Sequence, residues 1–435
     1  MAGAAGPRGP KRWRDQRWLV DEVIRTRGIE WDQPRLGYTL GPVGGEQMAG
    51  EMALLSGQIA KLADFVPAVR AAAQRREGLA EEAERAGHGA TAGEQWHAAA
   101  MLWSLAVWPL WEVTDELREL DERKNRAYLA WARHASHHVE RVDVDFGAAQ
   151  LPAWLHLPPG CVPGTSDAVP TVLAFGGMDG AREILVRREG DGLLGRGLAV
   201  LAVDGPGQGE AAIHGLHVTA TNWIDAGSAL LAWCRDRSEV DDERLVVSGT
   251  SFGSFWAMQV AATQPSLKGC AAALPVFEPG AGTIFERASP TFKARHMFMA
   301  GLFEDEPAFD RMVAGYDLRP LVASMAVPWL AIGGEADELS PATWVDDLAG
   351  RSAAPSTLIA YERARHALTE SPAPVLGPSW QATVADWLLD RVRSVPLSPS
   401  SHVVTVTGAV RPRTHPAAPA AVPATGPPQP QAVGG

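Results

Sequence analysis

The chain has 435 residues, of which 46% are hydrophobic and 21% are charged, and its formal net charge is −12 at pH 7. This length allows one large α/β domain with a smaller second domain, and the composition is that of a globular protein. The acidic balance argues against a nucleic-acid partner, because binding to phosphates depends on clustered lysine and arginine side chains.

The cysteines and the N-terminus indicate a cytoplasmic protein without a membrane partner. Cys161, Cys234 and Cys270 lie far apart and form no C-x-x-C pair, so neither a disulfide framework nor a thiolate metal site is predicted. We therefore expect the chain to function in a reducing compartment. The N-terminus has basic residues but not the apolar core of a leader peptide, and no apolar run is as long as a membrane span.

Residues 1–45 are predicted to be a mobile N-terminal segment that begins with a stretch rich in glycine, alanine and proline. Residues 46–138 follow with apolar side chains at helical spacing, and glycine and proline occur only near the breaks. This pattern predicts an all-helical cap domain of about four helices.

The pattern changes to that of strands at Val139. Residues 139–146 and 152–158 alternate as half-buried strands do, and short apolar runs separated by helix-sized segments follow them. Residues 139–395 are therefore predicted to form a doubly wound, mostly parallel sheet, with extra helices between Pro279 and Pro320. Residues 396–435 are rich in proline and alanine and are predicted to be a disordered tail.

The stretch "GTSFG", residues 249–253, stands between an apolar run and a helical pattern. It fits a nucleophile elbow, in which Ser251 occupies a strained strand-to-helix turn and the small flanking residues let strand and helix approach. An ordinary strand-to-helix turn is the alternative. The surrounding strand and helix patterns favour the elbow.

A serine nucleophile needs a base, and the base needs an acid that orients it. After Ser251 the chain offers both in the order Ser, Asp, His, each in a loop after a later predicted strand. We predict Asp337 as the acid, with Glu335 and Glu338 as competitors. We predict His366 as the base.

An oxyanion hole is predicted from Gly177, Met178 and Phe252. Gly177 and Met178 follow a buried strand directly, where their N–H groups can face the same point as that of Phe252. A second glycine-rich turn, "DGPGQG" at 204–209, lacks the G-x-G-x-x-G spacing of a dinucleotide site. No cofactor and no metal ion are predicted.

Four motifs together resemble the α/β-hydrolase superfamily: "AVDGPGQGEA", "GTSFG", "GGEADELSP" and "ERARHA". The helical first half and the turn "GGMDGAREI" resemble, more narrowly, the group of 2,6-dihydroxypseudooxynicotine hydrolase and the fungal hydrolases that shorten polyketide chains. This resemblance implies an α/β-hydrolase sheet with an N-terminal helical cap and hydrolysis of a carbon–carbon bond beside a carbonyl. It also implies a further catalytic acid in the turn, for which Asp179 is the first candidate and Glu183 the second.

The sequence thus predicts a serine-dependent hydrolase that forms an acyl-enzyme with a small-molecule substrate of β-diketone or polyketide-like type. A carboxylesterase or thioesterase that uses the same residues is the alternative. Asp179 is predicted to act as a protonated donor, and a purely structural role as a helix cap is the competing interpretation. The sequence does not decide whether the chain forms a homodimer.

Overall fold

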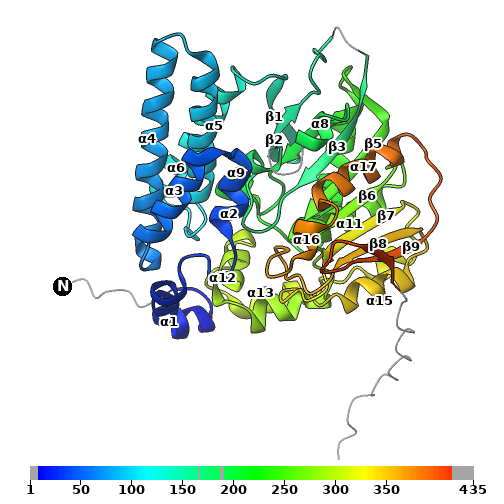
Figure 1. The fold of residues 1–435 in the computed structure, drawn as a ribbon. Helices are drawn as coiled ribbons and strands as arrows, with labels where there is room; N and C mark the ends of the chain where they lie inside the picture. The colour runs from blue at the N-terminus through cyan, green and yellow to red at the C-terminus, as the bar shows by residue number, and fades with distance from the viewer. Residues whose placement is uncertain (1–7, 165–166, 187–190, 414–435) are drawn as a thin grey trace, which may run out of the picture.

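A computed structural model describes residues 8–164, 167–186 and 191–413 (Figure 1). Its centre is a ten-stranded sheet in the order β1-β2-β4-β3-β5-β6-β7-β8-β9-β10. The pairs from β4 through β3 to β9 are parallel, and those at the two ends are antiparallel. The predicted doubly wound, mostly parallel sheet is therefore confirmed. The strands are β1 (Val139–Phe146), β2 (Ala149–His156), β3 (Val169–Phe175), β4 (Ala199–Val203), β5 (Val240–Thr250), β6 (Cys270–Ala273), β7 (Trp329–Gly334), β8 (Ser356–Tyr361), β9 (Ser400–Val404) and β10 (Val410–Pro412).

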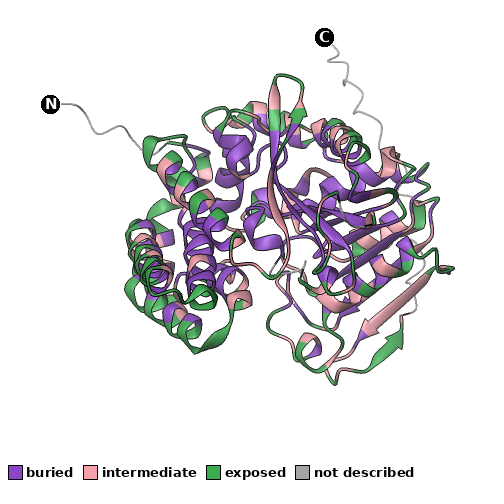
Figure 2. Ribbon diagram, turned by 90° about the horizontal axis from the view of Figure 1, so that it is seen from above, coloured by how far each residue is buried: buried purple, intermediate pink, exposed green. Residues whose placement is uncertain are grey.

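The middle of the sheet is covered on both faces. Every residue of β4 and β6 and the last six residues of β5 are buried, although successive side chains of a strand point to opposite faces. Figure 2 shows this buried centre with exposed residues on the outer helices. Helices that pack on the strands are α8 (Asp191–Leu194), α9 (Gly209–Ile213), α10 (Asn222–Arg235), α11 (Phe252–Thr263) and α17 (Trp380–Val392). The sheet domain also contains α7 (Glu183–Leu185), α15 (Thr343–Arg351) and α16 (Ala373–Leu376).

The central parallel strands end at one edge of the sheet. Thr250 of β5 pairs with Ala273 of β6, which pairs with Ile332 of β7, and Gly334 of β7 pairs with Tyr361 of β8. The loops that carry the predicted serine, acid and histidine therefore emerge side by side. Further helices lie between β6 and β7, as predicted: η4 (Pro279–Ala281), η5 (Thr283–Arg287), α12 (Pro290–Met299), α13 (Glu306–Val313) and α14 (Arg319–Val322).

A helical layer precedes the sheet and lies beside it (Figure 1). It consists of α3 (Gly45–Gln58), η2 (Leu62–Asp64), α4 (Phe65–Arg85), α5 (Gly89–Ala106) and α6 (Asp115–Ala132). Helix α5 is the centre of the layer, since most of its residues are buried and it packs against both α4 and α6. No helix in the described ranges is both long and apolar enough to cross a lipid bilayer.

The first 45 residues differ from the mobile segment that was predicted. Residues 8–45 contain α1 (Lys11–Arg27), α2 (Arg35–Leu40) and η1 (Gly41–Val43). Apolar side chains spaced along this polar segment, among them Val20 and Leu36, are buried. Helix α1 packs on α12, and α2 packs on α3 and α5. Residues 1–7 of the predicted segment lie outside the described residues.

The predicted tail also differs in its first part. Strand β9 adds to the parallel edge at β8, and β10 returns antiparallel to β9. The Val404 side chain at the end of β9 is buried, so this part of the tail gains enough contact to be ordered. The remainder of the predicted tail, 414–435, lies outside the described residues.

Candidate active site

Ser251 occupies the turn between β5 and α11 with backbone angles φ 56° and ψ −125°. This left-handed conformation is strained for a residue with a side chain. The backbone N–H of Ser251 donates to the carbonyl oxygen of Ala273 at 2.9 Å, which ties the turn to the end of β6. The turn has the geometry of the predicted nucleophile elbow.

The two glycines of "GTSFG" are required because backbone segments pass too close for a side chain. A Cβ atom at Gly249 would lie 2.0 Å from the carbonyl oxygen of Gly253. A Cβ atom at Gly253 would lie 2.4 Å from the carbonyl oxygen of Phe175 at the end of β3. The glycines therefore let β5, α11 and β3 converge around Ser251.

Ser251, His366 and Asp337 form one hydrogen-bonded chain. The Ser251 Oγ lies 2.9 Å from His366 Nε2, and His366 Nδ1 lies 2.8 Å from Asp337 Oδ2. Because the carboxylate accepts from Nδ1–H, Nε2 is left as the acceptor for the serine hydroxyl proton. The other carboxylate oxygen of Asp337 accepts from the backbone N–H groups of Leu339 and Ser340 at 2.8 and 2.9 Å, so its orientation is fixed.

The two competing acids contact backbone groups in the same loops. Glu338 Oε2 accepts from the backbone N–H of His366 at 2.8 Å, and Glu335 Oε2 accepts from the backbone N–H of Arg363 at 3.2 Å. Among these three acids, Asp337 is the one whose carboxylate hydrogen-bonds the imidazole. Glu338 holds the loop that carries the histidine.

The predicted oxyanion-hole residues surround the serine. A Cβ atom at Gly177 would lie 3.0 Å from the Ser251 Cβ and 3.4 Å from its Oγ, so the backbone there passes directly against the hydroxyl. Phe252 is the first residue of α11, where backbone N–H groups have no partner within the helix. Met178 is buried beside Gly177.

Gln208, which lies in the "DGPGQG" turn, fixes the peptide planes of this backbone. Its Nε2 donates to the carbonyl oxygens of Gly176 at 2.7 Å and Gly177 at 3.0 Å. In a trans peptide the C=O and the following N–H point in opposite directions. The N–H groups of Gly177 and Met178 therefore point away from Gln208. The sequence pattern of this stretch predicts only a turn.

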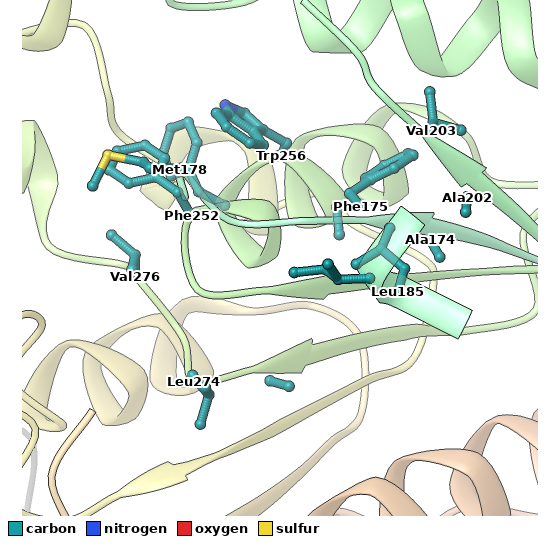
Figure 3. Packing of buried hydrophobic residues seen from close by; sticks show 14 of the residues in the cluster. Ala174, Phe175, Met178, Leu185, Ala202, Val203, Phe252, Trp256, Leu274 and Val276 are labelled. Carbon is teal, nitrogen blue, oxygen red and sulfur yellow. The ribbon is translucent and has the colours of Figure 1, made fainter. Parts of the chain in front are cut away.

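The turn is also held from the side of α12. Arg295 Nε donates to the carbonyl oxygen of Met178 at 3.0 Å. His296 Nδ1 lies 3.2 Å from Met178 Sδ, and His296 Nε2 lies 2.8 Å from the Tyr316 hydroxyl. Burial, with a contribution from Arg295, lowers the pKa of His296 to about 3. Figure 3 shows the buried apolar side chains of this region, among them Met178, Phe252, Leu274 and Val276.

Asp179 contacts the N-terminal segment and the helical layer. Its carboxylate accepts from Arg35 Nε at 2.9 Å, from Trp108 Nε1 at 3.2 Å and from the Tyr38 hydroxyl at 3.4 Å. Burial alone would lower the pKa of Arg35, but Asp179 and Asp32 raise it above its ordinary value. Three donors converge on this carboxylate, so the geometry favours an acceptor role over the predicted donor role.

The helix-cap interpretation of Asp179 is also not supported, since α7 has no side-chain cap. Glu183, the second candidate, is fully buried and is not among the described residues that line the cavity at Ser251. It accepts from Trp154 Nε1 at 2.8 Å and lies 3.3 Å from Lys124 Nζ of the helical layer. Burial alone would raise the pKa of Glu183, but Lys124 and Arg182 hold it below its ordinary value. Glu183 therefore links α6 to the sheet domain.

A cavity of about 50 Å³ adjoins Ser251 and His366. Its walls include Asp179 and, from the segment that was predicted to be mobile, Gln33 and Tyr38. Gln33 Nε2 also donates to Glu338 Oε1 at 3.3 Å. In the described part of the chain, no cluster of three or more His, Cys, Asp or Glu side chains could hold a metal ion.

The family of FrsA-like esterases matches residues 75–299, just over half of the chain. This chain belongs to the FrsA-like esterase family. The match begins inside α4 and includes the elbow, the glycine turn and α12. It ends before Asp337 and His366, which the fold brings to the serine.

The relatives are named hydrolases. The chain is 28% identical over 232 residues to α/β hydrolase ucsC of Acremonium, covering 48% of this chain and 46% of that protein. It is 26% identical over 316 residues to 2,6-dihydropseudooxynicotine hydrolase of Paenarthrobacter nicotinovorans, covering 71% and 80%. A third match, 35% identical, is 20-hydroxy-prefusarin hydrolase FUS2 of Gibberella moniliformis, covering 28% and 29%. The chain thus spans about half or less of the two fungal relatives' length.

Solved structures agree on the fold. The crystal structure of 2,6-dihydroxy-pseudo-oxynicotine hydrolase superimposes with a TM-score of 0.70 at 23% identity, covering 84% of this chain and 98% of that one. AbyA5 superimposes with a TM-score of 0.54 at 18% identity, covering 73% and 92%. The predicted α/β-hydrolase fold is confirmed.

Proposed function

We propose that this chain is a serine hydrolase that works through an acyl-enzyme on Ser251. The supporting observation is the hydrogen-bond chain from Ser251 Oγ through the His366 ring to Asp337. Ser251 attacks the substrate carbonyl while its proton passes to His366 Nε2. The resulting oxyanion is bound by the N–H groups of Phe252 and of Gly177 or Met178.

Collapse of the tetrahedral intermediate breaks the bond to the leaving group, which takes the proton from His366 Nε2–H. Water, activated by the same imidazole, then releases the acyl group. We propose that the bond broken is a carbon–carbon bond beside a carbonyl of a β-diketone or polyketide-like substrate. The leaving group is then an enolate, and the products are a carboxylic acid and a ketone. The support is the resemblance to the 2,6-dihydroxypseudooxynicotine hydrolase group and the 316-residue alignment with 2,6-dihydropseudooxynicotine hydrolase.

A carboxylesterase or thioesterase is the second candidate, and one observation favours it. Asp179 is engaged by Arg35, Tyr38 and Trp108, so it is not a free acid for the protonation of a leaving carbon. An alkoxide or thiolate leaves with the single proton that His366 carries.

The test compares a β-diketone with an aryl ester of the same acyl group in H₂¹⁸O. We expect both to give the same carboxylic acid with one labelled oxygen, and the diketone to give the matching ketone. Ser251→Ala should abolish both reactions. Ester turnover without diketone cleavage would support the esterase and reject the carbon–carbon hydrolase. Diketone cleavage by the Ser251→Ala variant would overturn the serine mechanism.

A further inference from the structure

A second hollow lies next to the catalytic cavity. It is a groove of about 410 Å³ between the N-terminal segment at residues 34–42 and the chain that follows His366. The two spaces share two lining residues, Tyr38 of α2 and Ala367. Tyr38 also borders a small hollow beside Trp108. One tyrosine and one alanine therefore separate the groove from the space beside Ser251.

The two hollows differ in the size of molecule that they accept. One water molecule needs roughly 10–15 Å³ of such space, so the inner cavity of about 50 Å³ has room for a few waters. Ligand pockets in proteins usually measure about 300–1,000 Å³, and the outer groove falls in this range. A substrate whose carbonyl reaches Ser251 must therefore extend its remaining atoms past Tyr38.

The lining of the groove indicates what those atoms are. Pro34, Pro42 and Trp380 supply apolar and aromatic surface, and Thr369 and Gln381 supply neutral polar groups. Among the described residues that line the groove none carries a charge. A charged chain would lose its hydration without a partner there, whereas a neutral, mainly apolar chain gains from burial.

We propose that this groove is a substrate subsite that binds an extended, neutral chain attached to the carbonyl that Ser251 attacks. Tyr38 is the gate between the subsite and the catalytic cavity and sets the length and width of chain that can reach the serine. The inference rests on the proposed serine-hydrolase function, and it adds the chemical class of the substrate's remote part. Three parts of the chain build the subsite: the N-terminal segment, the loop after the catalytic histidine and the start of α17.

Gly41 allows the groove to be filled without damage to the fold. Gly41 lines the groove, a Cβ atom placed there meets nothing within 4 Å, and its φ of −54° suits any residue. Gly41→Trp should therefore occupy the groove while the fold is kept. Gly57, an exposed residue of α3 with equally open surroundings, provides the matched control Gly57→Trp.

The experiment measures kcat/KM for p-nitrophenyl acetate and for p-nitrophenyl dodecanoate. We expect Gly41→Trp to lower the value for dodecanoate by at least about tenfold, the low end for a lost apolar contact, and to leave acetate within about twofold. Gly57→Trp should change neither. Tyr38→Ala should raise the value for a branched acyl ester relative to acetate, and Tyr38→Phe should keep the wild-type preference. Equal effects of Gly41→Trp on both esters, or none on either, would overturn the subsite.

A binding measurement separates the subsite from the chemistry. In the Ser251→Ala background, calorimetry with a long-chain methyl ketone needs no turnover, and Gly41→Trp is expected to weaken its binding by at least about tenfold. If the wild-type enzyme hydrolyses neither ester but the ketone still binds in this Gly41-dependent way, the proposed function fails and the subsite stands. Binding of the ketone that does not depend on Gly41 would overturn the subsite.

Discussion

Arg35 Nε lies 2.9 Å from Asp179 Oδ2, which ties the N-terminal segment to the turn that passes beside the serine. The Arg35 guanidinium carbon also lies 3.8 Å from the ring centroid of Trp108 in the stretch after α5. Three parts of the chain therefore meet at one carboxylate. This contact holds the segment that supplies Gln33 and Tyr38 to the wall of the catalytic cavity.

Asp179→Asn should loosen this junction and should not remove a proton donor. Hydrogen bonds to charged groups are worth about 1.5–3 kcal/mol, so we expect a loss of that size in the free energy of unfolding, measured by urea denaturation. Aryl ester hydrolysis and diketone cleavage should fall by the same factor. Trp108→Phe, which removes a neutral donor, should lower the free energy of unfolding and the two activities by less. A selective loss of diketone cleavage with unchanged stability would restore Asp179 as a catalytic acid.

Asp337 and Glu335, two of the acids after β7, should differ clearly in their effect on turnover. Asp337→Asn should cost about 10⁴ in turnover, because it presents the wrong histidine tautomer to the serine. Glu335→Gln should be close to wild type, since Glu335 accepts from the backbone N–H of Arg363 while Asp337 is the acid bonded to the imidazole. The measurement is kcat on an activated aryl ester, with circular dichroism as the control for folding. Near-normal activity of Asp337→Asn would show that another residue orients His366.

Gln208→Leu should act on the transition state and not on substrate binding. Without the Nε2 donor, the carbonyls of Gly176 and Gly177 lose their anchor and the N–H groups are no longer aimed at the oxyanion. We expect kcat to fall by about 10²–10³, the cost of losing one oxyanion-hole donor, with little change in KM. Affinity for a trifluoromethyl ketone should fall in proportion to kcat. A rise in KM with unchanged kcat would contradict this positioning role.

His296 should make the fold sensitive to acid. Its pKa is about 3 in the folded chain against about 6.5 for an ordinary histidine. The neutral form is thus favoured by folding, and its stabilisation is complete above pH about 6.5 and is lost as the pH falls toward 3. This group alone contributes a slope of up to about 1.4 kcal/mol per pH unit. His296→Gln should reduce the slope of unfolding free energy between pH 6.5 and 4, and an unchanged slope would contradict the assignment.

The predictable part of the site is contiguous in the sequence or follows the order of the strands along the chain. The elbow was evident because strand, serine and helix are contiguous from 243 to 262. Asp337 and His366 were found because parallel strands deliver their loops to one edge of the sheet. The choice among Asp337, Glu335 and Glu338 needed the structure, because side chains a residue or two apart in one loop point in different directions.

What could not be predicted depends on contacts between distant residues. Gln208 reaches a carbonyl 32 residues earlier in the chain, and Arg35 pairs with a carboxylate 144 residues later. No pattern in either segment encodes its partner. The N-terminal helices were missed for a similar reason, since Val20 and Ile24 stand among charged residues and are buried only by the rest of the fold.

The most direct test of the central claim is to react the folded protein with a fluorophosphonate and to locate the adduct by peptide mass spectrometry. We predict a single adduct on Ser251, with labelling slowed by several orders of magnitude in His366→Ala because the hydroxyl then lacks its base. No adduct, or an adduct on another residue at the same rate in the Ser251→Ala variant, would contradict the assignment of Ser251 as the nucleophile.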